Sequence, residues 1–200
     1  MIVDQYSTWS ASTGQIIYPN QNGTATNDSL SLNLRYSGLD INSQTNEIAV
    51  LDDQNHRILV LNRSNLSIFS AILSDSSNYT NLSNISYSPS AFVYDDNNSL
   101  YILDSWNLQI TQMENSLDYG DNATLMNKSI SLQSNGTLQG LCVDPVNKSI
   151  FISDSLHHQI IRYNSSMSNG SIYIGNGTKG NTNNLLNGPT SIVMNNNQTL

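Results

Sequence analysis

Short apolar runs separated by polar, turn-forming segments make up most of this chain. The clearest runs lie at 48–51, 100–103 and 150–153, and the segments between them are rich in Asn, Ser, Asp and Gly. Apolar runs of this length between turn formers are typical of strands that are covered on both faces. No segment has a convincing helical period. The pattern therefore predicts an all-β protein.

Three segments align without a gap and reveal an internal repeat. They read EIAVLDDQNHRILVLN at 47–62, SLYILDSWNLQITQME at 99–114 and SIFISDSLHHQIIRYN at 149–164. One column holds Asp52, Asp104 and Asp154, spaced by 52 and then 50 residues. Each copy predicts an apolar strand, a turn capped by the Asp side chain, and a more polar strand at the outer edge of a sheet.

Further apolar runs complete the repeat. A run precedes each aligned segment, and the four copies lie at 38–41, 91–94, 140–143 and 191–194. A first strand is expected before each of these, at 15–18, 67–70, 128–132 and 171–174. Four short strands in a period of about 50 residues are typical of a propeller blade. We therefore predict one partial β-propeller over residues 1–200, with repeats at 15–62, 67–114 and 128–164 and an incomplete one at 171–200.

The turn sequences carry a family resemblance. The segment DDQNHRI at 52–58 resembles the signature of NHL repeats, and DSWNLQI at 104–110 and DSLHHQI at 154–160 look like diverged copies. Only the first copy holds Asn, His and Arg together, since Gln109 and Gln159 occupy the Arg column. The resemblance implies a six-bladed disc, so this chain would be a fragment whose remaining blades belong to a longer protein.

Charge and hydropathy narrow the classes of partner. The formal net charge is -8, the pI is about 4.4, and only seven Lys and Arg are scattered along 200 residues. A nucleic-acid binder needs a clustered basic surface, so we expect no nucleic-acid partner. No apolar stretch reaches the 18 or more residues of a membrane-spanning helix, so we expect no membrane insertion in this segment.

Acceptor sites for N-linked glycans are dense. The pattern Asn-x-Ser/Thr occurs sixteen times, which suits a glycosylated, extracellular or cell-surface protein. No signal peptide is visible at the start, and we expect it to be lost with a missing N-terminus. The sites that we expect to be used are Asn22, Asn62, Asn81, Asn122, Asn135, Asn147, Asn164 and Asn176.

Four features suggest chemistry but have simpler structural interpretations. Gly175, Gly177 and Gly180 spell G-x-G-x-x-G, but turn formers rather than a helix follow, which indicates an interblade loop. The Asp column is best explained by turn capping. His56 and His158 share a column with Leu108, which indicates packing rather than metal binding. The single cysteine, Cys142, lies in an apolar run and is expected to be buried and inert.

One turn position is a candidate contact site. Trp106 occupies it in the second copy, where the other copies hold Gln54 and Leu156. An exposed Trp on the rim of a propeller would be an anchor for a partner, whereas a ring folded onto its own blade would not. The candidate contact residues are Trp106, His157 and Gln54.

We therefore expect a non-catalytic extracellular recognition module, without a cofactor, that binds protein or glycan partners through propeller loops. Two alternatives follow from the resemblance. The chain could be part of a propeller enzyme, a metal-dependent lyase or lactone hydrolase, whose active-site residues lie outside this segment. It could also be the substrate-binding arm of a RING/B-box ubiquitin ligase.

Overall fold

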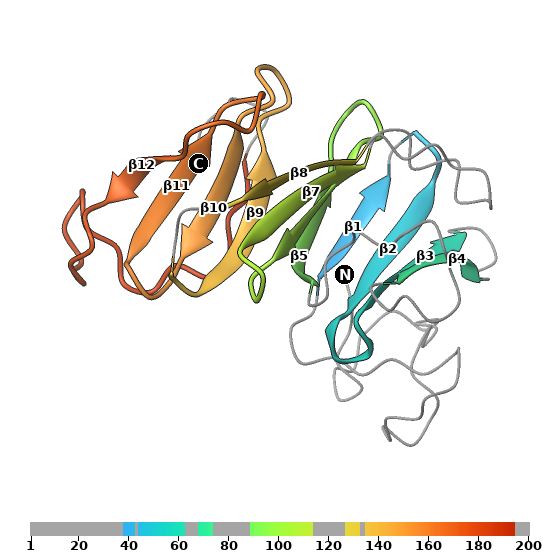
Figure 1. Ribbon diagram of the computed structural model, residues 1–200, viewed down its shortest axis with the longest axis horizontal. Helices are drawn as coiled ribbons and strands as arrows, with labels where there is room; N and C mark the ends of the chain where they lie inside the picture. The colour runs from blue at the N-terminus through green and yellow to red at the C-terminus, as the bar shows by residue number, and fades with distance from the viewer. Residues whose placement is uncertain are drawn as a thin grey trace, which may run out of the picture.

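The computed structural model describes residues 38–42, 44–62, 68–73, 89–113, 127–132 and 135–194. These residues form three four-stranded antiparallel sheets, in which each strand pairs with its neighbour along the chain (Figure 1). The only helical element among them is the 3-10 turn Asp53–Asn55. The all-β prediction is confirmed. No helix in the described part of the chain is long and apolar enough to cross a membrane.

The strands are short and regularly spaced. The first sheet contains β1 (Leu39–Asn42), β2 (Glu47–Asp52), β3 (Arg57–Asn62) and β4 (Ile68–Leu73). The second contains β5 (Pro89–Tyr94), β6 (Leu100–Asp104), β7 (Gln109–Met113) and β8 (Asn127–Ser131). The third contains β9 (Leu138–Val143), β10 (Ile150–Asp154), β11 (Gln159–Tyr163) and β12 (Ser171–Gly175). The three nearly apolar strands predicted at 48–51, 100–103 and 150–153 are β2, β6 and β10.

The predicted outer-edge position of β3, β7 and β11 is wrong. Each of these strands pairs on both sides, as β3 does with β2 and β4. Their apolar residues are buried, and the polar Arg57 at the start of β3 instead forms an ion pair with Asp52. The outer edge strands are β4, β8 and β12, at the opposite edge of each sheet from β1, β5 and β9. The repeat alignment had assigned these outer strands to the following copy. The sequence repeat and the sheet are therefore out of phase by one strand.

The predicted strands at the two ends of the chain have different outcomes. The first-strand segment at 15–18 lies outside the described residues. The fourth copy at 191–194 lies beside β9 but joins none of the three sheets. Its position beside β9 is fixed by close approach, because a Cβ added at Gly140 would lie 2.8 Å from the Thr190 carbonyl oxygen.

The sheets pack face to face through apolar clusters. Ala49, Leu51, Ile58 and Val60 of the first sheet meet Phe92, Leu100 and Ile102 of the second. The other face of the second sheet, including Tyr101, Leu103 and Ile110, packs against the third. Strands β1, β5 and β9 lie next to one another along one side of the stack (Figure 1). The middle sheet is thus covered on both faces, which explains why β6 is apolar from Leu100 to Leu103.

A third cluster covers the far face of the third sheet. Cys142, Phe151 and Ile160 are buried there beneath Leu186 and Ile192. Burial raises the pKa of the Cys142 thiol to about 12, with Asp144 adding to the shift. Because the thiolate is the reactive form, this cysteine is unreactive near neutral pH. The expected buried position of Cys142 is confirmed.

Candidate recognition rim

The turns β2–β3, β6–β7 and β10–β11 lie at corresponding ends of their sheets, and we call this edge the recognition rim. In the second sheet, Asp104 Oδ1 accepts hydrogen bonds from the backbone N–H groups of Trp106 at 3.0 Å and Asn107 at 2.9 Å. Asn107 Nδ2 donates to Asp104 Oδ2 at 2.8 Å. The Asp104 side chain is buried. One carboxylate therefore fixes the whole turn.

The other two turns use the same carboxylate with different partners. Asp154 accepts from the His157 backbone N–H at 3.1 Å, and its Oδ2 lies 2.7 Å from His157 Nδ1. Asp52 accepts from Asn55 Nδ2 at 3.0 Å and from Arg57 Nε at 2.6 Å. The turn-capping interpretation is confirmed for Asp104 and Asp154, which accept from backbone N–H groups of their turns. Asp52 makes no such cap bond and holds its turn through the side chains of Asn55 and Arg57 instead.

The column of His56, Leu108 and His158 has a backbone explanation that we did not predict. Their φ angles are 52°, 52° and 50°, so all three residues adopt the left-handed conformation. This region is uncommon for side-chain-bearing residues but several-fold enriched in His. Leu108 does pack against the core, whereas His56 is exposed. The packing interpretation therefore holds for Leu108 but not for the exposed His56, and the turn geometry unites the column.

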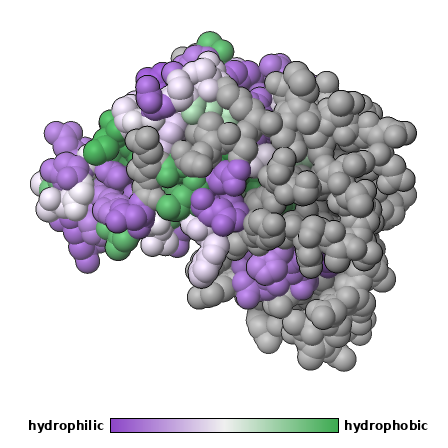
Figure 2. All heavy atoms as spheres, in the orientation of Figure 1, coloured by the Kyte–Doolittle hydropathy of each residue, from purple (hydrophilic) through white to green (hydrophobic). Residues whose placement is uncertain are grey.

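The candidate contact residues lie at the tips of these turns. The Trp106 side chain is 83% exposed, so its ring is not folded onto its own sheet. Leu156 occupies the same position in the third sheet and is 56% exposed, and Gln54 is exposed in the first. His157 is partly exposed beside Leu156. Among the coloured residues on the face shown in Figure 2, hydrophilic ones predominate and hydrophobic ones form small groups.

The glycine-rich segment forms a loop on the same rim. Gly175 and Gly177 have φ angles of 87° and 85°, which side-chain-bearing residues rarely adopt. The loop folds back so that the Gly188 backbone N–H donates to His158 Nδ1 at 3.0 Å. No helix follows within the described residues up to 194. The interblade-loop interpretation of G-x-G-x-x-G is confirmed.

The opposite edge of the sheets carries the turns β1–β2, β5–β6 and β9–β10. Asp144 Oδ1 accepts from the Val146 backbone N–H at 2.9 Å, and Asp95 Oδ1 likewise accepts from Asn97 at 2.9 Å. Lys148 Nζ lies 3.5 Å from Asp95 Oδ2 and joins two neighbouring sheets. Val146 is 68% exposed at this edge, so each edge displays an apolar side chain.

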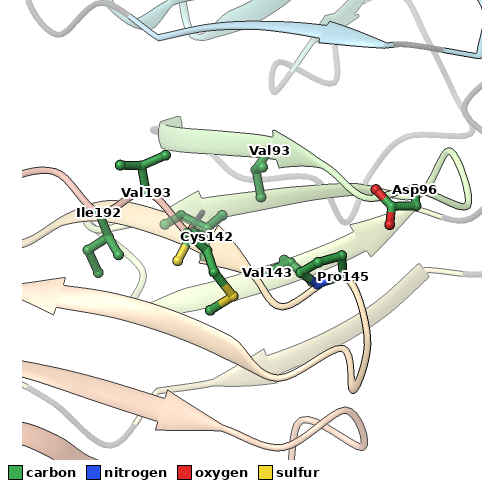
Figure 3. A pocket seen from close by; sticks show the side chains of 9 residues that line it. Val93, Asp96, Cys142, Val143, Pro145, Ile192 and Val193 are labelled. Atoms are coloured by element: carbon green, nitrogen blue, oxygen red, sulfur yellow. The ribbon is translucent and has the colours of Figure 1, made fainter. Parts of the chain in front are cut away.

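A pocket of about 440 Å³ lies beside β5 and β9, the neighbouring edge strands of the second and third sheets (Figure 3). Its walls are apolar, including Val93, Cys142 and Ile192, and Asp96 is its one acidic lining residue. Among the described residues, no group of three or more His, Cys, Asp or Glu side chains could hold a metal ion. Sequence reasoning missed this pocket, because its walls come from segments about 50 residues apart.

The predicted glycan acceptors fall into two groups. Asn62, Asn135, Asn147, Asn164 and Asn176 are all exposed. Asn22, Asn81 and Asn122 lie outside the described residues. Exposure is needed for modification but does not test it, so glycosylation stays a prediction.

Solved structures identify the architecture. Virginiamycin B lyase from Staphylococcus aureus matches 81% of this chain with a TM-score of 0.55 and 10% identity. Hydrazine synthase from Kuenenia stuttgartiensis matches 88% with a TM-score of 0.57 and 10% identity. The fold is a β-propeller. A Bacteroides thetaiotaomicron protein of unknown function matches 77% with a TM-score of 0.56 and 10% identity.

These propellers are similar to the chain in fold alone. The chain covers 46%, 44% and 40% of their respective lengths, which is less than half in each case. No protein-family model and no curated protein matches the sequence. The partial-propeller prediction is confirmed, and the NHL assignment stays a prediction.

Proposed function

We propose that this chain is part of an extracellular, glycosylated NHL-type propeller that recognises protein or glycan partners through its recognition rim. It carries out no reaction and needs no cofactor. The remaining blades belong to the full-length protein. Binding is centred on the exposed tips of the capped turns, with Trp106 as the main anchor and His157 and Gln54 beside it on neighbouring blades.

The exposure of Trp106 carries this proposal. Trp is enriched among the residues that dominate binding energies, and its large ring loses little conformational freedom on binding. Three hydrogen bonds to the buried Asp104 hold the turn on which Trp106 lies. A fixed platform reduces the entropy lost on association. The same backbone displays Gln54 and Leu156 on the neighbouring turns, so the rim varies in chemistry while its geometry is retained.

Two further observations support the family and the compartment. The Asp52, Asn55 and Arg57 side chains of the NHL-like signature contact one another and build the turn, as a repeat signature should. The five predicted glycan acceptors in the described residues are all exposed, which suits modification in a secretory compartment.

The test is a binding screen of the chain against an oligosaccharide array and a displayed peptide library. For each hit, we expect Trp106→Ala to weaken binding by at least tenfold, as truncation of an anchoring residue does. Val146→Ala is the matched control, because it truncates an exposed apolar side chain at the opposite edge. Equal affinities of the wild type and Trp106→Ala for every hit would overturn the proposed site. The class of the hits distinguishes glycan from protein recognition.

The pocket beside β5 and β9 favours a second candidate, in which the chain is part of a propeller enzyme. One structure of similar fold is a catalytically inactive lyase with quinupristin bound. The pocket beside β5 and β9 is a concave, mostly apolar site of the kind that binds small molecules. Incubation of the chain with quinupristin, followed by mass spectrometry, tests this version. Recovery of intact quinupristin only would count against lyase activity in this segment.

A further inference from the structure

Two adjacent histidines in the β10–β11 turn use the same ring atom in opposite ways. His157 Nδ1 lies 2.7 Å from the buried carboxylate of Asp154, so this nitrogen donates a proton to the bond. His158 Nδ1 instead accepts from the Gly188 backbone N–H at 3.0 Å. A neutral imidazole has one donor and one acceptor nitrogen, whereas a protonated imidazole has two donors. The two bonds must therefore respond differently to pH.

We propose that His158 is a pH-sensitive latch that holds the 176–190 loop on the recognition rim and loosens when its ring is protonated. Protonation adds a hydrogen to Nδ1, which then faces the Gly188 N–H and can no longer accept from it. The His157–Asp154 bond survives, because Nδ1 of His157 carries a proton in both states. Histidine is the side chain that most commonly changes charge between pH 5 and 8. The latch is closed while the His158 ring is neutral and is lost when the ring is protonated.

The surroundings of the latch make this bond important for the loop. Within the loop, Gly180 N–H donates to the Leu186 carbonyl at 3.0 Å, so this part of the loop is braced internally. Its described attachments to the third sheet are the His158–Gly188 bond, the Ser153 Oγ–Thr190 bond of 3.2 Å and the packing of Leu186. Only the first of these contains an imidazole, which can gain a proton.

Six other titratable or charged groups share the elements that adjoin the latch. The titratable or charged groups on its turn, on β11 and β12 and on the loop are Asp154, His157, Arg162, Tyr163, Tyr173 and Lys179. Asp154 is engaged by His157 and by Gln159. Among these groups, the histidines alone change charge between pH 5 and 8 when unperturbed.

The latch would regulate the site proposed above. Gly188 lies against the same turn that displays Leu156, since a Cβ at Gly188 would lie 3.8 Å from the Ser155 carbonyl oxygen. When the loop loosens, the surface of the recognition rim next to Leu156 and His157 changes. This consequence rests on the proposed function, whereas the latch itself rests only on the His158–Gly188 geometry.

The test is amide hydrogen exchange at Gly188, measured by NMR at pH 7.5 and pH 5.0 without any ligand. After correction for the intrinsic pH dependence of exchange, we expect Gly188 protection in the wild type to fall about fivefold at pH 5.0, as for the loss of one hydrogen bond. His158→Leu should show low protection at both pH values. Leucine suits this position, because Leu108 has the same backbone conformation in the second sheet.

The control variant is His157→Asn, since Asn107 occupies the equivalent position in the second sheet. It should retain the pH dependence at Gly188. Equal protection of wild-type Gly188 at both pH values would overturn the latch, as would a pH dependence that persists in His158→Leu. Neither result would affect binding through Trp106 at pH 7.5, so the latch and the recognition proposal can fail separately.

Discussion

The turns β6–β7 and β10–β11 share one backbone but display different chemistry. Both are capped by a buried aspartate, Asp104 or Asp154. In both, the residue four positions after the aspartate, Leu108 or His158, has a left-handed backbone conformation. The exposed tip is Trp106 in one and Leu156 in the other. The first turn faces solvent with an aromatic ring, whereas the second holds a loop through His158. The comparison indicates that the aspartate and the left-handed residue fix the geometry, while the remaining positions are free to acquire a function.

The largest expected effect comes from removing a cap. Asp104→Ala leaves two backbone N–H groups and the Asn107 amide without their acceptor at a buried position. We expect a loss of about 2–3 kcal/mol in the free energy of unfolding, because three hydrogen bonds to a buried carboxylate are lost. Urea unfolding measures it.

Asp104→Asn is the matched control, since its side-chain oxygen can still accept from the backbone, and it should lose clearly less. Equal losses for Asp104→Ala and Asp104→Asn would mean that the charge, rather than the cap, stabilises the turn.

A smaller effect is expected at the left-handed position of the first turn. His56 is exposed with a φ of 52°, a conformation that costs a side-chain-bearing residue about 1–2 kcal/mol. Glycine removes that cost but adds chain entropy to the unfolded state. We expect His56→Gly to stabilise the chain by about 0.5 kcal/mol in the same unfolding measurement. A loss of stability would show that the His56 side chain contributes more than its backbone conformation costs.

The smallest effect on stability is expected at the tips themselves. Leu156→Trp gives the third turn the tip residue of the second. Because the position is exposed, we expect the free energy of unfolding to change by less than about 0.5 kcal/mol. Affinity for any ligand bound through Trp106 should increase or stay the same. A large loss of stability on urea unfolding would show that Leu156 is a packing residue after all.

The sequence predicted these turns better than it predicted the sheets. The Asp column identified the capped turns because an Asx cap is a local feature, formed within five residues. The left-handed column was missed, although a repeat position shared by His and Leu at the end of a turn was the available signal. The edge strand was misplaced because a mixture of apolar and polar residues, as in QITQM of β7, is found in a strand that pairs on both sides as well as in an edge strand.

Long-range features could not be predicted at all. The His158–Gly188 bond joins residues 30 apart in sequence, and the pocket brings together β5, β9 and residues 192–194. Neither of these long-range features corresponds to a repeating pattern in the sequence. Trp106 was identified as a candidate from its repeat column, but its exposure depends on the direction of the ring, which no pattern encodes.

The one-strand offset between sequence repeat and sheet decides where the chain can be divided. The stretch of chain that begins the next aligned repeat completes the preceding sheet, as β4 and β8 do. Duplication or truncation at the boundaries of the aligned repeat would therefore separate an edge strand from its sheet, whereas boundaries placed after β4 or β8 would keep all four strands of each sheet together.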